Sequence, residues 1–203
     1  MSLTLRPMQL QDVSQVVAID RVAFSTPWSA RTYTYEIDEA ENSHMLTVEY
    51  LVSPPPARGL RRVIHQFLPP APTPYTVVAY GGLWRFMDEA HISTIASHPQ
   101  WRGQGYGELA LAAMIRRAYL LNAGYIALEV RLSNHAAQQL YIKYGFTIYA
   151  TKQRYYRDNG EDAYDMRLTL SRAAWAEFEQ RFRALQAQRG FTDIYSAPPG
   201  SKA

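Results

Sequence analysis

The spacing of apolar residues along the chain predicts a regular succession of strands and helices. An apolar period near 3.6 residues indicates an amphipathic helix, whereas alternation, or a short run rich in β-branched and aromatic residues, indicates a strand. On this basis we expect strands at 3–6, 45–52, 75–84, 89–97, 125–131, 146–156 and 163–170. We expect helices at 9–23, 27–40, 106–122, 135–144 and, behind Ser171 as an N-cap, 172–189.

Glycine and proline residues mark the boundaries of these elements. Gly124 and Gly145 stand where helices commonly end, and Asn159-Gly160 is a strong hairpin signal between the last two strands. Residues 53–74 hold seven of the chain's 12 prolines, so this segment cannot form a central strand or a long helix. We interpret 53–74 as a loop insertion, which is either a solvated surface loop or an arm that binds a partner.

The order of the elements indicates an α/β fold of the α+β kind, with a largely antiparallel first half. A length of 203 residues fits one domain, which we expect to span 1–170. Residues 171–203 would then add a C-terminal helix and a tail that is frayed from residue 190. The apolar face of this helix is too short to distinguish packing on its own chain from a dimer face, so we expect a monomer or a weak dimer.

Composition excludes several classes of chemistry. The chain has no cysteine, which excludes a Cys nucleophile, a Cys-based zinc site and disulfides. Its five histidines show no metal-binding spacing, so no metal is predicted. A net charge of +3 without a Lys/Arg cluster predicts no nucleic-acid partner. No apolar run approaches the ~18 residues of a membrane span, and the start lacks a signal-peptide pattern. We therefore expect a soluble cytoplasmic protein without membrane contact.

Glycines at 103, 105 and 107 directly precede an apolar helix, although glycine there costs conformational entropy. The first turn of a helix offers unpaired N–H groups and a partial positive charge, and glycines let a phosphate approach the backbone closely. Two common phosphate motifs fit poorly. A P-loop needs a Lys-Ser/Thr pair, and a Rossmann fingerprint needs a third glycine where Glu108 stands. A glycine-bearing helix start without a ligand is the remaining alternative.

The pattern Arg102-x-x-Gly105-x-Gly107 resembles the pyrophosphate-binding motif of the GNAT superfamily of N-acetyltransferases. Three longer stretches, TIASHPQWRGQGYG, LEVRLSNHAAQQLYIKYGF and RYYRDNGEDAYDM, together with PWS at 27–29, resemble its ribosomal-protein-alanine N-acetyltransferase (RimI-like) branch. The resemblance covers roughly 1–170, apart from the proline-rich insertion. It implies the GNAT fold, with a mixed, mostly antiparallel central sheet flanked by helices, and acetyl-CoA as co-substrate without a metal.

The resemblance assigns two catalytic residues. Glu129 matches the family's general base, and partly dry surroundings could raise its pKa; otherwise it is a solvated carboxylate that pairs with Arg131. Tyr141 matches the general acid that protonates the sulfur of coenzyme A, since a phenol keeps its proton at neutral pH. The alternative for Tyr141 is an ordinary core aromatic.

The resemblance also implies residues that bind the co-substrate and the acceptor. The implied cofactor-binding residues are Ile95, Ala96, Ser97, Arg102, Gly103, Gln104, Gly105, Tyr106, Gly107, Glu108 and Asn134. Asn134 could equally cap its helix. Trp28, Tyr155 and Tyr156 are implied at the entrance for a peptide substrate, although each could be a packing or surface aromatic.

Some positions depart from the family's pattern. Glu108 stands where relatives often carry a basic residue beside the phosphates, and a carboxylate there repels phosphate. Ser97 replaces a usual apolar residue, and Arg154 and Arg157 flank the tyrosine pair where Asn and Pro would stand. These differences bear on cofactor affinity and peptide choice rather than on the fold.

We therefore expect an acetyl-CoA-dependent N-acetyltransferase that acts on the N-terminal α-amine of a protein. The resemblance implies the N-terminal alanine of a small-subunit ribosomal protein as the acceptor, with direct transfer in a ternary complex. Two alternatives stay open: an acetyltransferase for a small amine or a lysine side chain, and a catalytically weak acyl-CoA-binding module.

Overall fold

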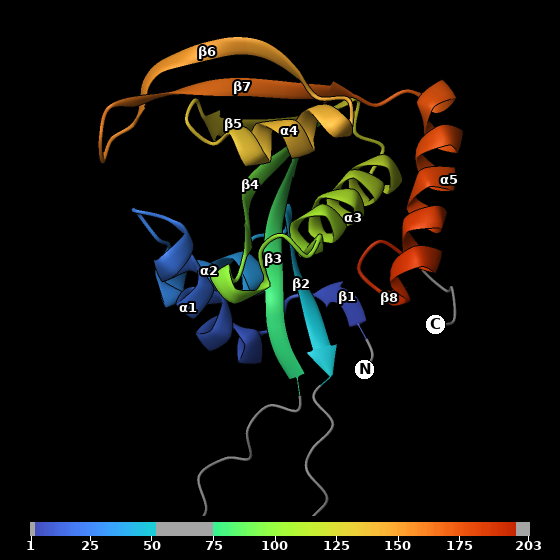
Figure 1. Ribbon diagram of the computed structural model, residues 1–203, viewed down its shortest axis with the longest axis horizontal. Coiled ribbons are helices and arrows are strands. Elements are labelled where there is room, and N and C mark those ends of the chain that lie inside the picture. Colours follow the sequence, from blue (N-terminus) through green and yellow to red (C-terminus); the bar gives the residue numbers. More distant parts are fainter. Residues whose placement is uncertain (1–2, 52–74, 198–203) are drawn as a thin grey trace, which may run out of the picture.

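The computed structural model describes residues 3–51 and 75–197, so the predicted insertion at 53–74 lies outside the described residues. The strands are β1 (Leu3–Pro7), β2 (Ser43–Leu51), β3 (Tyr75–Phe86), β4 (Glu89–Ser97), β5 (Tyr125–Arg131), β6 (Thr147–Tyr156), β7 (Glu161–Thr169) and β8 (Phe191–Asp193). The α-helices are α1 (Val13–Ala23), α2 (Ala30–Asp38), α3 (Tyr106–Leu120), α4 (His135–Lys143) and α5 (Arg172–Arg189), with short 3₁₀ helices at Leu10–Asp12 and Pro99–Trp101 (Figure 1). Each expected strand and helix is present, with ends that differ by a few residues.

The described strands form one sheet in the order β6-β7-β5-β4-β3-β2-β1-β8. Neighbouring strands run antiparallel except for two parallel pairs, β4 with β5 and β1 with β8. The expectation of a mixed, mostly antiparallel sheet is confirmed. The hairpin predicted at Asn159-Gly160 joins β6 to β7, and Gly160 has a φ of +72°, which glycine adopts without a steric penalty.

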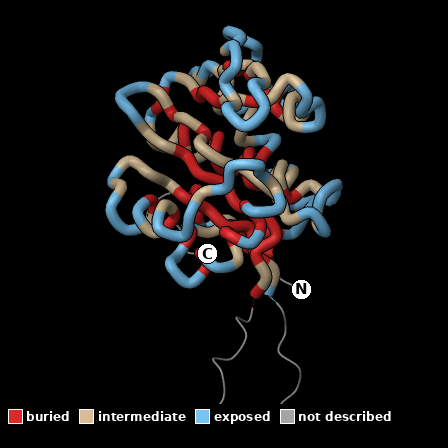
Figure 2. The backbone as a smooth tube through the Cα atoms, turned by 90° about the vertical axis from the view of Figure 1, so that its left-hand side faces the viewer, coloured by how far each residue is buried: buried red, intermediate tan, exposed pale blue. Residues whose placement is uncertain are grey.

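Helices cover both faces of this sheet. On one face α1 and α2 bury an apolar cluster that includes Val16, Ile19 and Tyr33. On the other face α3 is buried along nearly its whole length and forms the larger core with the central strands and α4. Figure 2 shows the buried positions running through the middle of the fold, with exposed positions at the loops. The fold therefore fixes the start of α3 against the sheet.

Strands β4 and β5 separate after a short stretch of pairing. Their parallel ladder joins Glu89–His91 to Tyr125–Ala127 and ends there, although β4 continues to Ser97 and β5 to Arg131. The two strands therefore diverge, and the backbone groups beyond His91 and Ala127 have no partner on the facing strand. This divergence opens the sheet at the point where the candidate catalytic residues lie.

The C-terminal segment is more ordered than expected. The prediction of a frayed tail from residue 190 is wrong for residues 190–197, because β8 pairs in parallel with β1, and Tyr195 and Ser196 are buried. Helix α5 packs on its own chain, with the rings of Trp175 and Tyr119 centred 4.8 Å apart. A three-residue strand carries too weak an apolar pattern to predict, since its partner β1 is distant in sequence. Among residues 3–51 and 75–197, no helix has both the length and the apolar character to cross a bilayer.

Candidate active site

A cleft of about 1120 Å³ opens where β4 and β5 diverge. It brings together seven of the residues predicted from the sequence: Trp28, Ile95, Glu129, Asn134, Tyr141, Tyr155 and Tyr156. The walls come from the loop between α1 and α2, from β4, β5 and α4, and from the β6–β7 hairpin. Both predicted catalytic side chains therefore face one shared space.

Glu129 lies in the wall of this cleft between two basic side chains. The Nε2 atom of His91 lies 3.2 Å from Oε2, and the ammonium of Lys152 is hydrogen-bonded to Oε1. Burial tends to raise the pKa of Glu129, but the hydrogen bonds and charges of His91 and Lys152 outweigh burial and lower it to about 2. The expectation of a raised pKa is therefore wrong, because both basic partners come from strands that the sequence alone does not place beside Glu129.

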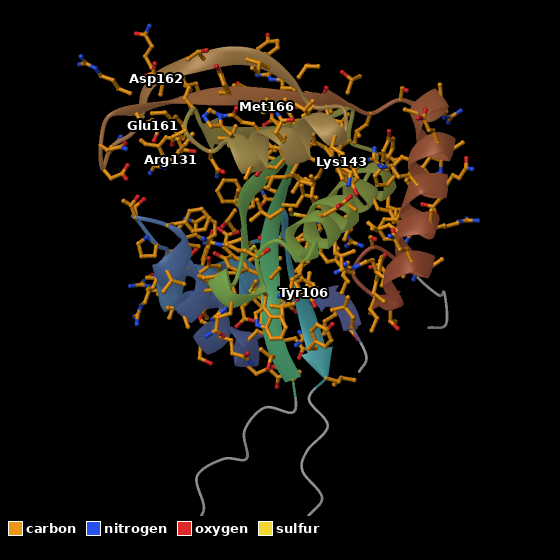
Figure 3. The ribbon with its side chains drawn as sticks, viewed as in Figure 1. Tyr106, Arg131, Lys143, Glu161, Asp162 and Met166 are labelled. Atoms are coloured by element: carbon orange, nitrogen blue, oxygen red, sulfur yellow. The ribbon has the colours of Figure 1, made fainter. Side chains whose placement is uncertain are left out.

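Arg131 does not pair with Glu129, so that alternative is also wrong. Its guanidinium binds Asp158 at 2.9 Å and Glu161 at 3.0 Å, and it lies 3.8 Å from the centre of the Tyr156 ring. Figure 3 shows Arg131 beside Glu161 at the free end of the β6–β7 hairpin. Successive residues of a strand point to alternate faces, so Glu129 and Arg131 share a face, but the hairpin supplies Arg131 with closer carboxylates.

Tyr141 extends from α4 into the same cleft and is 5% exposed. Its hydroxyl forms no hydrogen bond with any residue that the structure describes. Burial, and after it the charge of Tyr156, raise the pKa of Tyr141 above its ordinary value of 10. The phenol is therefore protonated at neutral pH and can donate its proton to a group in the cleft.

The glycine turn precedes α3 and has the conformation that the sequence suggested. Gly103 and Gly105 have φ values of +74° and +80°, and Gly105 is the N-cap of α3. A Cβ atom on Gly107 would lie 3.2 Å from Oγ of Ser97, so this glycine allows the turn to pack closely on the end of β4. The turn thus presents the first backbone N–H groups of a 15-residue helix, a geometry that suits a phosphate group.

The side chains of this turn differ in what they offer to a ligand. Tyr106 is 4% exposed and its hydroxyl is hydrogen-bonded to that of Tyr50, so little of its side chain is open to a ligand. The carboxylate of Glu108 lies 2.7 Å from Nζ of Lys143 and accepts a hydrogen bond from Tyr144, and these partners offset burial and lower its pKa. The negative charge of Glu108 is therefore neutralised from α4 rather than directed at the turn.

Comparison with known proteins agrees with this geometry. Residues 14–146 match the model of the acetyltransferase (GNAT) family. The chain belongs to this family. It is 32% identical to a putative [ribosomal protein bS18]-alanine N-acetyltransferase of Bacillus subtilis (strain 168) over 167 residues, which are 82% of this chain and 95% of the relative. The match confirms the resemblance to the ribosomal-protein-alanine branch, and the chain is an N-acetyltransferase.

Solved structures show the same fold. The crystal structure of the ribosomal-protein-S18-alanine N-acetyltransferase from Escherichia coli superposes with a TM-score of 0.64 at 25% identity, covering 83% of this chain and 94% of that chain. A structure of the NatC complex bound to Gag peptide and CoA superposes with a TM-score of 0.63 at 19% identity, covering 84% of this chain and all of that chain. The second likeness concerns the fold alone.

The predicted cofactor-binding residues Ala96, Ser97 and 102–108 of this acetyltransferase lie beside the cleft rather than in its wall, whereas Asn134 belongs to the wall. Ala96 and Ser97 continue β4 from the cleft toward the glycine turn, and Nε of Arg102 donates to the carbonyl oxygen of Ser97 at 3.4 Å. Asn134 lines the cleft and also caps α4, since its side chain accepts a hydrogen bond from the backbone N–H of Ala137 at 3.2 Å. The two uses proposed for Asn134 are thus compatible.

Sequence reasoning missed a buried carboxylate in the acetyltransferase's cleft. Asp20 is 2% exposed, and it accepts hydrogen bonds from the backbone N–H of Trp28 at 2.5 Å and from the hydroxyl of Tyr80. Asp20 continues the apolar spacing of Val13 and Val16 along α1. A charged residue at a core-facing position of the helix could therefore have indicated this carboxylate from the sequence. Asp20 holds the α1–α2 loop, and with it Trp28, against the cleft.

His91 and Lys152 were also missed, and no local pattern could reveal them. They lie on β4 and β6, on opposite sides of β5 in the sheet. Lys152 reaches across to Glu129 and lies 3.6 Å from Oδ2 of Asp165, which is opposite Glu129 on β7. Only the strand order brings these residues together.

Proposed function

We propose that this N-acetyltransferase uses acetyl-CoA to acetylate the N-terminal α-amine of a protein, and that the preferred acceptor is the N-terminal alanine of a small-subunit ribosomal protein. One observation carries the proposal: Glu129 and Tyr141 face a single cleft that begins where β4 and β5 part. The relatives in Bacillus subtilis and Escherichia coli are named as [ribosomal protein bS18]-alanine N-acetyltransferases, which supports the choice of acceptor.

The residues around the glycine turn fit the coenzyme. Gly103 and Gly105 hold a left-handed conformation at the start of α3, where the first backbone N–H groups have no partner within the helix, and Gly107 lets α3 start close to Ser97. We propose that this turn binds the diphosphate and that the unpaired edge of β4 from Ile92 to Ser97 binds the pantetheine arm. When bound, acetyl-CoA would supply a thioester as the acetyl donor.

The side chains in the cleft supply the rest of the chemistry. The carboxylate of Glu129 is ionised at neutral pH and attracts an ammonium group, while its low pKa makes it a weak proton acceptor by itself. His91 is hydrogen-bonded to Glu129, so the two form a unit that can take the proton which the acceptor amine must lose. We propose that Tyr141 protonates the departing thiolate; its protonated phenol, which has no other hydrogen-bond partner among the described residues, supports this role.

A hydrogen-bonded bridge between two walls of the cleft supports a chain end, rather than a bulky surface, as the acceptor. Oγ of Ser25 lies 2.5 Å from Oδ2 of Asp158, so the α1–α2 loop is joined to the turn of the β6–β7 hairpin across the mouth of the cleft. Arg131 binds both residues and reinforces this bridge. A slender group such as a peptide N-terminus can enter under the bridge more easily than a folded segment.

A panel of acceptors tests the proposal. Purified protein with acetyl-CoA is offered peptides with N-terminal Ala, Ser, Gly or Met, an N-terminally blocked peptide with an internal lysine, and a polyamine, and the products are read by mass spectrometry. We expect acetylation at the α-amine, fastest with alanine. Faster modification of the blocked peptide or the polyamine would contradict the choice of acceptor, and binding of acetyl-CoA without any product would favour a non-catalytic module.

A further inference from the structure

Helix α5 brings its last residue to the glycine turn. It lies beyond residues 14–146, the part that matches the family model. It packs antiparallel to α3, because Trp175 near its start contacts Tyr119 near the end of α3, whereas Arg189 at its end contacts Gln104 just before α3. Arg116 of α3 binds Glu179 of α5 at 2.9 Å and fixes this alignment.

The guanidinium of Arg189 lies flat against the turn. Its Nη2 donates to the carbonyl oxygen of Gln104, and a Cβ atom built on Gly105 would lie 3.6 Å from Cζ and from both terminal nitrogens. The same group lies 5.5 Å from the centre of the Tyr106 ring. A distance of 3.6 Å is ordinary van der Waals contact, so the guanidinium packs directly on the turn at Gly105, a position that its φ of +80° reserves for glycine.

The charge of Arg189 has no counterion in the part of the chain that the structure describes. Among the described residues its hydrogen-bond partner is the Gln104 carbonyl oxygen, and the carboxylate of Glu108 in the first turn of α3 is already bound to Lys143. A hollow of about 440 Å³ lies beside the guanidinium, lined by Leu3, Tyr50, Gln104, Tyr106, Gln188 and Arg189. An exposed cation with free donors thus stands next to backbone N–H groups that favour an anion.

We propose that Arg189 is a phosphate-binding residue for the coenzyme A moiety, delivered to the turn by α5. The proposal rests on the proposed use of acetyl-CoA. A guanidinium has five N–H donors, so with one on Gln104 it keeps others for phosphate oxygens, which it binds with charge-assisted hydrogen bonds. Arg189 thus brings a positive charge from the C-terminal helix to the start of α3, where the nearest side chain in the helix itself, Glu108, is a carboxylate.

Calorimetric titration of the full chain with coenzyme A tests this role. Arg189→Gln keeps an amide donor for the Gln104 carbonyl oxygen but removes the charge. We expect about tenfold weaker binding at 50 mM salt, the size of effect typical of one charge-assisted hydrogen bond. At ~1 M salt the difference should shrink to about twofold, because salt screens the attraction. Arg183→Gln on the same helix is the matched control and should bind as the parent does, because the Arg183 side chain is 76% exposed and pairs with Glu179.

A second ligand shows which phosphate of coenzyme A Arg189 contacts. If 3′-dephospho-coenzyme A shows the same loss in Arg189→Gln, Arg189 acts on the diphosphate; if the loss disappears, it acts on the 3′-phosphate, and either result supports the proposal. Equal affinity of Arg189→Gln and parent overturns it, as does a loss that salt does not change, because the side chain would then only support the turn. Absence of heat with the parent itself would refute the use of acetyl-CoA, which is a distinct result.

Discussion

The Nε2 atom of His91 lies 3.2 Å from Oε2 of Glu129, so the cleft carboxylate is paired before any acceptor arrives. Burial lowers the pKa of His91, but Glu129 and Glu89 raise it above its ordinary value of 6.5. The same contact contributes to the low pKa of Glu129. We therefore expect proton transfer in this cleft to involve both residues of the pair, and their coupling should be visible in the pH dependence of the rate.

Replacing His91 should change the acid limb of the pH–rate profile. In the parent enzyme we expect kcat/KM to rise as the pair loses its proton, at a pH above 6.5, because His91 titrates there. His91→Asn removes this titration and leaves Glu129 ionised, so only the titration of the peptide's own α-amine, with an ordinary pKa of about 7.7–8.0, should remain in the profile, and the maximal rate should be lower by about tenfold or more. The measurement is kcat/KM from pH 5 to 9; an unchanged acid limb would show that His91 takes no part.

Removing the hydroxyl of Tyr141 should affect turnover and little else. Tyr141→Phe deletes a group that has no hydrogen-bond partner among the described residues, so the fold should be retained. Loss of a general acid lowers kcat by roughly 10²-fold or more. Steady-state kinetics and calorimetry with acetyl-CoA check this, and Tyr144→Phe at the C-cap of the same helix is a control that removes a hydroxyl bound to Glu108 instead. Full activity of Tyr141→Phe would refute the assignment.

A double-mutant cycle should detect the contact between Gly107 and Ser97. Gly107→Ala places a Cβ atom 3.2 Å from Oγ of Ser97, which requires the hydroxyl or the helix to move. We expect a loss of about 1 kcal/mol in the free energy of unfolding. In a Ser97→Ala background the clash disappears, and Gly107→Ala should instead raise the free energy of unfolding by about 0.5 kcal/mol because alanine has the higher helix propensity. Urea denaturation of the four proteins gives the coupling, and additive effects would show that the two residues do not touch.

The bridge between Ser25 and Asp158 should influence the acceptor and not the coenzyme. Ser25→Ala removes the hydroxyl that lies 2.5 Å from Asp158 and 3.1 Å from Arg131. The α1–α2 loop then has to be ordered when the peptide binds, so KM for the peptide should rise several-fold while acetyl-CoA affinity stays the same. Ser29→Ala removes the N-cap of α2 at the other end of this loop and is the control. An equal rise in the peptide KM of both variants would indicate that any destabilisation of the α1–α2 loop has this effect, and would contradict a specific role for the bridge.

His44 on β2 should make the fold sensitive to mild acid. Burial, and then the charge of Arg117, lower its pKa from 6.5 to about 4. The unfolded chain binds this proton more readily, so the stability is fully present above pH 6.5 and is lost as pH falls toward 4. Between pH 7.5 and 4.5 the free energy of unfolding of the parent should fall by roughly 2 kcal/mol more than that of His44→Gln. Denaturation curves at both pH values measure this, and a constant difference between the two proteins would contradict it.

The sequence by itself determined the elements and the residue types of the site. Local patterns are enough for this: apolar spacing located the strands and helices, Ser171 and Gly145 marked helix ends, and the glycines at 103–107 marked the start of α3. The motifs around Glu129 and Tyr141 also indicated the family, since they extend over contiguous residues. Each of these patterns lies within a short contiguous segment of the sequence.

The tertiary structure decided the electrostatics and the supporting contacts. Glu129 has a low pKa because β4 and β6 place His91 and Lys152 beside it, and Arg131 is drawn away by the hairpin. Residues 190–197 are ordered because β8 completes the edge of the sheet at β1, and Arg189 reaches the turn because α5 packs antiparallel to α3. These outcomes depend on groups far apart in the chain, and their energies follow distance in space, which local sequence patterns do not record.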